Sequence, residues 1–155
     1  MTSVPVVTVL WHAPFLSAGG YCSEAIAFAQ ALQHSRALRL RIAQHGDSFN
    51  AAFVESIHQR TAALFSDLLS ASESEQQQQQ LRIDVCHSEP GAWSAPEPLY
   101  TSIASCPSGR SRTYSIGRTM FETDRLPAGW LPPLNFMDEI WVPTEFAKDV
   151  FQRAG

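Results

Sequence analysis

The feature that most constrains the fold is a mostly apolar run near the N-terminus that is rich in β-branched residues. Residues 6–11, VVTVLW, do not alternate with polar residues, which is typical of a strand that is covered on both faces. The run ends at His12 and is followed by a loop that contains Gly19 and Gly20. From about Ser23 onward apolar residues recur at helical spacing, at Ala25, Phe28, Ala29 and Leu32. A buried strand followed by an amphipathic helix predicts a parallel βαβ unit.

The same alternation of strand and helix patterns continues along the chain. We expect further strands over 38–42, 81–86, 113–120 and 139–142, and a second helical stripe over 53–68. Thr144 is expected to cap a last helix that ends at Gly155. The apolar residues expected to face inward from this helix are Phe146, Val150, Phe151 and Ala154. The pattern therefore predicts one α/β domain over 1–155, a Rossmann-like parallel sheet flanked by helices.

Two stretches depart from this pattern. Residues 70–80, SASESEQQQQQ, contain too little apolar surface to form part of a core, and we expect a disordered low-complexity insertion there. Residues 88–112 carry four prolines and two glycines, and no regular structure is predicted for them.

Composition excludes some classes of partner and favours one compartment. The net charge of −4 provides no broad basic field, which argues against nucleic acid as a partner. The three cysteines form no CxxC pair, so we expect no disulfide framework and favour a reducing compartment. The N-terminus shows no basic segment before an apolar core, and its apolar run is too short to span a membrane. The sequence therefore predicts a cytoplasmic protein.

Candidate site residues lie where the predicted strands end, because ligands of open parallel sheets bind beyond the carboxyl ends of the strands. These positions are His12, Gly19, Gly20, Asp47, His87, Glu122, Asp124, Arg125 and Thr144. Gly19 and Gly20 allow a ligand to approach backbone amides at a helix N-terminus, or they serve a turn that needs positive φ. Both interpretations stay open. The spacing of a dinucleotide fingerprint is absent, and so is a Walker lysine.

The other candidates also have two interpretations. Glu122, Asp124 and Arg125 can orient ligand hydroxyls, since carboxylates accept hydrogen bonds and arginine donates several. The alternative is a surface turn with a local ion pair. Glu24 is interpreted as a favourable charge near the positive end of a helix rather than as a catalytic group. A zinc site at His12 or His87 would need further ligands that the spacing does not supply, so no metal is predicted and the catalytic residues remain unknown.

One segment carries a family resemblance. Residues 114–155, YSIGRTMFETDRLPAGWLPPLNFMDEIWVPTEFAKDVFQRAG, contain a strand, a charged turn, a proline-rich crossing and a strand-helix unit. This order resembles the second half of the N-terminal domain of retaining GT-B glycosyltransferases, the group 1 or family-4-like enzymes. Residues 13–25, APFLSAGGYCSEA, resemble the first loop and helix start of that domain. The resemblance covers most of the chain and is strongest over 116–155, while the family's C-terminal donor-binding domain is absent from the 155 residues.

The resemblance implies transfer of a sugar from a nucleotide-sugar donor to an acceptor hydroxyl, with no required metal and no cofactor besides the nucleotide sugar as substrate. Gly19 and Gly20 would border the donor diphosphate and the acceptor, and Thr144 would lie near the acceptor cleft. Glu122 stands where many family members carry a histidine. The chain alone is expected to be inactive and to self-associate. The alternatives are a non-catalytic carbohydrate-binding or interaction domain, or a truncated inactive gene product, so whether the chain is itself an enzyme stays open.

Overall fold

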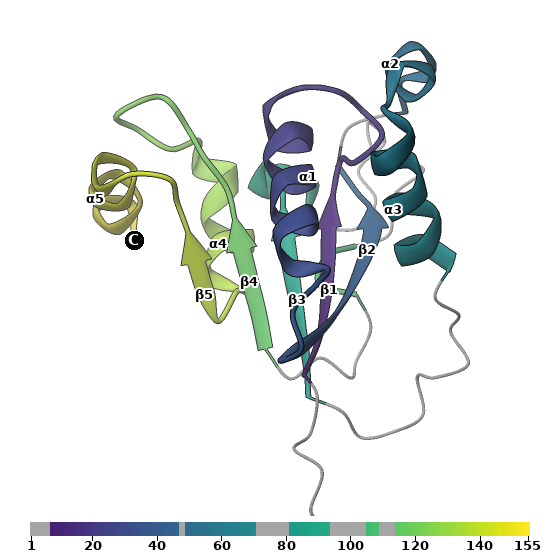
Figure 1. Ribbon diagram of the computed structural model, residues 1–155. Helices are drawn as coiled ribbons and strands as arrows, with labels where there is room; N and C mark the ends of the chain where they lie inside the picture. Colours follow the sequence, from purple (N-terminus) through teal and green to yellow (C-terminus); the bar gives the residue numbers. More distant parts are fainter. Residues whose placement is uncertain (1–6, 47–48, 71–80, 94–104, 109–113) are drawn as a thin grey trace, which may run out of the picture.

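The chain forms a five-stranded parallel sheet with the strand order β2-β1-β3-β4-β5. The computed structural model describes residues 7–46, 49–70, 81–93, 105–108 and 114–155. All four strand pairings are parallel. Figure 1 shows α1 across one face of the sheet and α4 behind the other. The predicted α/β, Rossmann-like sheet flanked by helices is therefore confirmed.

The elements follow the predicted order. The strands are β1 (Val7–Ala13), β2 (Leu38–Gln44), β3 (Arg82–His87), β4 (Tyr114–Arg118) and β5 (Glu139–Trp141). The helices are α1 (Gly20–Leu32), α2 (Ala51–Ser56), α3 (Gln59–Ser70), α4 (Leu131–Asn135) and α5 (Glu145–Ala154), with 3-10 turns η2 (Pro90–Ala92) and η4 (Ala128–Trp130). Among the described residues, no helix has both the length and the apolar character that a bilayer crossing requires.

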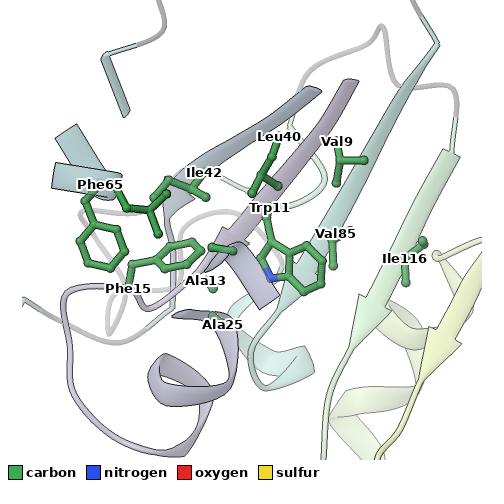
Figure 2. Close-up of a cluster of buried hydrophobic side chains, with 12 residues drawn as sticks. Val9, Trp11, Ala13, Phe15, Ala25, Leu40, Ile42, Phe65, Val85 and Ile116 are labelled. Carbon is green, nitrogen blue, oxygen red and sulfur yellow. The ribbon is translucent and has the colours of Figure 1, made fainter. Parts of the chain in front are cut away.

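The larger hydrophobic core lies between one face of the sheet and the helices α1 and α3. Trp11 of β1 is at its centre, 2% exposed, between Val85 of β3 and the small residues of α1 (Figure 2). The Trp11 ring stacks on Phe28 with 5.0 Å between ring centroids. Successive residues of a strand point to opposite faces, so the next residue, His12, is directed to the other side of the sheet. Residues 7–11 of β1 are all buried or half-buried, which agrees with a strand covered on both faces.

A smaller core lies on the opposite face. It consists of Cys86, Trp93, Cys106 and Leu134, with half-buried side chains such as Ile140 packed against it. Gly117 of β4 makes this packing possible. A Cβ atom there would lie 2.4 Å from Cη2 of Trp93 and 2.8 Å from Cδ1 of Ile140. The indole ring therefore occupies the space that a side chain at position 117 would need.

The cysteine prediction was wrong. Cys86 and Cys106 form a disulfide across a sequence separation of 20, and Cys22 is a buried free thiol. The bond joins the strand β3 to the segment 105–108. The intervening residues gave no periodic pattern, so the sequence contained no signal that would bring the two cysteines together. The cysteine argument for a reducing compartment is thereby lost.

Two helix predictions also need correction. The stripe over 53–68 is not one helix, because Ile57 is extended with φ −62° and ψ 128° and separates α2 from α3. In α5, Phe146 does not face inward: it is 57% exposed, while Ala147 and Val150 are buried. Ser70, assigned above to the low-complexity insertion, is the last residue of α3, and residues 71–80 lie outside the described residues.

Candidate functional site

Polar side chains converge on the α1 face, where β3 and β4 end. His87 is the last residue of β3, Arg118 is the last residue of β4, and Glu24 lies one turn into α1. Arg118 donates a hydrogen bond from Nη2 to Oε1 of Glu24, and Nε2 of His87 lies 2.8 Å from Oε2 of the same carboxylate. The side chains of His87 and Arg118 are 0% and 6% exposed, whereas that of Glu24 is 28% exposed. Two buried side chains therefore hold the carboxylate, which itself reaches the surface.

Trp11 determines which ring nitrogen of His87 carries the proton. Its indole Nε1 lies 3.1 Å from Nδ1 of His87. An indole N–H can only donate, so Nδ1 accepts, and Nε2 carries the proton that is donated to Glu24. Burial lowers the pKa of His87 from 6.5 to about 4, despite the opposing attraction of the Glu24 carboxylate. His87 is thus a neutral hydrogen-bond donor near neutral pH.

Further hydrogen bonds tie the loop after β4 to this cluster. Nη1 of Arg118 donates to the carbonyl oxygens of Thr119, at 3.1 Å, and Trp141, at 3.3 Å. The hydroxyl of Tyr21 donates to the carbonyl oxygen of Met120 at 3.0 Å and accepts from the Met120 amide at 3.3 Å. Burial raises the pKa of the Tyr21 hydroxyl. The start of α1 and the ends of β4 and β5 are therefore fixed relative to one another.

The glycine pair lies at the start of α1. Gly19 is the residue before the helix and has φ 107°, so the turn that needs positive φ is present. Gly20 is the first residue of α1, and a Cβ atom built at either glycine meets nothing within 4 Å. Both glycines are exposed. The space beside the helix N-terminus is open, and ligand approach there stays a prediction.

His12 is not brought together with the glycine pair. It is 4% exposed and lies on the sheet face opposite α1, with Nε2 3.9 Å from Oδ1 of the buried Asp84. Arg82 donates to both carboxylate oxygens of Asp84, at 2.8 and 3.0 Å. Burial alone would raise the pKa of Asp84, but the neighbouring His12 and Arg82 outweigh it and hold this pKa below its usual value. His12 therefore lies beside a buried carboxylate on the face opposite α1.

Within the described residues, none of the remaining candidates forms a hydrogen bond or ion pair with Glu24. Glu122, Asp124 and Arg125 are exposed in the turn after β4, and within the described ranges none of the three forms an ion pair. The hydroxyl oxygen of Thr144 accepts from the Ala147 amide at 3.1 Å, which confirms the predicted cap of α5. Asp47 lies outside the described residues. In the part of the chain that the structure describes, no group of three or more potential metal ligands comes together.

The sequence interpretation missed the arrangement that the structure shows. It treated Glu24 as a favourable helix charge and His87 as a candidate at a strand end, and it did not connect either residue with Arg118. The contacts of Glu24 with His87 and Arg118 join positions 63 and 94 residues apart, so no local pattern contains them. The available signal was a polar residue at the end of each of two buried strands, together with an acid one turn into the helix that covers them.

The fold and the cluster define a class of protein, a Rossmann-like α/β domain with a polar site at the carboxyl edge of its sheet. Comparison with protein-family models, with curated proteins and with solved structures gives no match.

Proposed function

We propose that this chain is the acceptor-side domain of a glycosyltransferase, which transfers a sugar from a nucleotide-sugar donor to an acceptor hydroxyl. The observation that carries the proposal is the Glu24 carboxylate, held by His87 and Arg118 and 28% exposed at the carboxyl edge of the sheet. Ligands of parallel α/β sheets bind at this edge. An ionised carboxylate accepts hydrogen bonds from hydroxyl groups, which are the main polar groups of a saccharide.

Two further features support the proposal. Residues 114–155 and 13–25 resemble the N-terminal domain of retaining GT-B enzymes, and the order β4, α4, β5, α5 agrees with the order of elements expected from that resemblance. The open space beside Gly19 and Gly20 lies at the N-terminus of a 13-residue helix. Backbone amides at such a position favour an anion such as a diphosphate.

The proposed chemistry divides between two domains. A second α/β domain would bind the nucleotide sugar, and closure of the cleft would bring donor and acceptor into reacting geometry. The helix N-terminus after Gly19 would stabilise the diphosphate as negative charge develops on it. The contribution of this chain is to bind and orient the acceptor, and the proposal needs no metal and no cofactor beyond the nucleotide sugar.

The second candidate function is a carbohydrate-binding domain without catalytic activity. The same Glu24 cluster favours it, because binding of a saccharide does not require a donor domain. The two candidates differ in whether a second α/β domain belongs to the same polypeptide. Sequencing the coding region beyond Gly155 tests this: an open frame into a second α/β domain supports the transferase, and a stop codon there supports the binding domain.

A turnover assay tests directly whether these 155 residues transfer sugar without a second domain. The 155-residue chain is incubated with a panel of nucleotide sugars and simple acceptors, and nucleotide release is followed. We expect no turnover above background, since the proposed donor-binding domain is not part of these 155 residues. Turnover that persists through further purification would overturn the proposed role as an acceptor domain only.

A further inference from the structure

We infer that Glu24 contacts ligand directly and accepts hydrogen bonds from the hydroxyl groups of a neutral polyol, and that Trp11, His87 and Arg118 are positioning residues that hold its carboxylate. The inference deepens the proposed function and rests on it only for the identification of the polyol as a saccharide acceptor. The contact itself follows from the geometry of the cluster.

The first step is the hydrogen-bonding capacity of Glu24. An ionised carboxylate offers about four acceptor positions, two on each oxygen. His87 uses one position on Oε2 and Arg118 uses one on Oε1. One position on each oxygen is left, on a side chain that is 28% exposed. Two adjacent acceptors on a fixed carboxylate match a pair of neighbouring hydroxyl donors.

The second step is the charge of the cluster. The positive charge of Arg118 balances the negative charge of Glu24, and His87 is neutral. A cationic ligand would therefore meet a carboxylate that is already compensated. An anionic ligand such as phosphate would meet the exposed carboxylate, and the negative charge of Glu89 also acts on the neighbouring Tyr21. An uncharged hydroxyl compound is the ligand class that fits this cluster.

The third step is the role of the buried residues. A protonated His87 would direct an N–H at the N–H of Trp11, so the hydrogen bond from Trp11 keeps Nδ1 as an acceptor and Nε2–H directed at Glu24. Arg118 is anchored through two carbonyl oxygens, those of Thr119 and Trp141. Both partners of Glu24 are thus fixed by contacts of their own, and the carboxylate is held in one orientation before ligand arrives.

The direct test is an NMR titration of the isotopically labelled 155-residue chain near neutral pH. Three probes are compared: methyl α-D-glucopyranoside as the neutral polyol, inorganic phosphate and tetramethylammonium. We expect only the glycoside to shift the Glu24 carboxyl signal. Glu24→Gln should weaken glycoside binding by about tenfold, since a hydrogen bond to a charged acceptor becomes one to a neutral acceptor. The matched control is Glu145→Gln, which alters an exposed acid in the first turn of α5 and should leave binding unchanged.

The positioning role is tested by the ring nitrogens of His87. Their ¹⁵N shifts should report the Nε2–H tautomer in the wild-type chain and a mixture of tautomers in Trp11→Phe, which removes the indole donor. Trp11→Phe should also weaken glycoside binding several-fold. His87→Gln retains a side-chain N–H donor and should bind closer to the wild-type level than His87→Leu. Should these core variants fail to fold, the wild-type ring shifts and the Glu24→Gln titration still decide the inference.

Several outcomes would overturn the inference. One is unchanged glycoside binding by Glu24→Gln. Others are the absence of any glycoside-dependent shift, or shifts at Glu24 with phosphate or tetramethylammonium but not with the glycoside. A wild-type His87 that carries its proton on Nδ1 would also overturn it. Failure of the proposed function is distinguishable. If the glycoside requires Glu24 but a longer polypeptide carrying a second α/β domain transfers no sugar, glycosyl transfer is rejected and the polyol contact stands.

Discussion

The indole N–H of Trp11 lies 3.1 Å from Nδ1 of His87, and this contact joins the centre of the hydrophobic core to the polar cluster at the sheet edge. Trp11 belongs to β1 and His87 to β3, 76 residues later. Because the two strands are neighbours in parallel register, Trp11 lies beside Val85 and its side chain reaches the histidine one position further along the same face. Trp11 thereby determines which ring nitrogen of His87 carries the proton, and His87 in turn contacts Glu24.

The first prediction is a loss of stability on mild acidification. The pKa of His87 is about 4 in the folded chain and 6.5 for the ordinary side chain. Above about pH 6.5 neither state is protonated and the full stability is present. As the pH falls toward about 4 only the unfolded state takes up the proton, so the free energy of unfolding falls, by on the order of 3 kcal/mol in total. Urea unfolding measured across this window checks the prediction.

The control for this prediction is His87→Gln, which does not titrate and should show a flatter dependence over the same window. Asp84, whose pKa is held below its usual 3.8, adds a further loss only at lower pH, so its effect is separate. A wild-type chain whose unfolding free energy is constant from neutral pH to about 4 would contradict a buried, neutral His87.

The second prediction concerns Gly117. Gly117→Ala would place a methyl group 2.4 Å from Cη2 and 2.7 Å from Cζ3 of the Trp93 ring, which cannot move without disturbing the smaller core. We expect a destabilisation of about 1–3 kcal/mol or more, the usual cost of overpacking a core. Thermal and urea unfolding measure it. Gly129→Ala is the matched control because a Cβ atom at Gly129 meets nothing within 4 Å, and equal stability of the two variants would contradict the packing of Trp93 on β4.

The parallel sheet and the order of elements along the chain were predictable because strands and helices follow from local sequence patterns. The apolar run of β1, the stripe of α1 and the Thr144 cap each depend on residues within one element, and the structure has all three. Boundaries were less predictable. The stripe over 53–68 continued through Ile57 even though the backbone there is extended, since apolar spacing alone does not reveal a break between two helices.

The site was less predictable for a physical reason. Glu24, His87 and Arg118 meet only because parallel strands bring their carboxyl ends to one edge and α1 crosses above that edge. Residue type indicated which side chains carry chemistry, whereas their pairing depends on side-chain directions fixed by long-range packing. His12 illustrates this, because it follows Trp11 directly but points to the opposite face of the sheet.

The third prediction separates the two glycines of the first loop. Gly19 has φ 107°, so Gly19→Ala should cost about 1–2 kcal/mol of stability from backbone strain. Gly20 has open space around it, so Gly20→Val should fold normally and fill the region that a ligand is proposed to enter. Unfolding measurements and the glycoside titration together check the pair. Full binding by Gly20→Val would show that the loop is not a ligand contact.

The fourth prediction is a thiol count. The chain has three cysteines, of which Cys86 and Cys106 are bonded and Cys22 is free. Titration of the denatured, unreduced protein with a thiol reagent should therefore find one thiol, and reduction should release two more. Cys106→Ser should lower stability by about 3 kcal/mol, the effect expected for a closed loop of this length. Three reactive thiols before reduction would contradict the bond.

The last prediction is that the 155-residue chain self-associates through the β5 side of the sheet. In the described part of the chain β5 pairs with β4 only, so its other edge has no strand beside it. Trp141 and Phe146 are 36% and 57% exposed near this edge. A pocket of about 540 Å³ is lined in part by Trp141, and its other apolar lining residues include Leu134, Ile140 and Phe151. Unpaired edges and exposed apolar surface favour association between copies.

The expected strength follows from the area involved. Covering a few hundred Å² of apolar surface at ~25 cal/mol per Å² contributes several kcal/mol, which is comparable with a typical domain stability of ~5–15 kcal/mol. Sedimentation velocity over a concentration series should show dimers or larger species, and Phe146→Ser should shift the distribution toward monomer without lowering the unfolding temperature. Phe49→Ser is the matched control, because Phe49 is 61% exposed near α2, on the side of the sheet where β2 is the edge strand, and its loss should leave association unchanged. A compact, heat-stable monomer that binds no hydrophobic dye would show that the β5 side needs no covering partner.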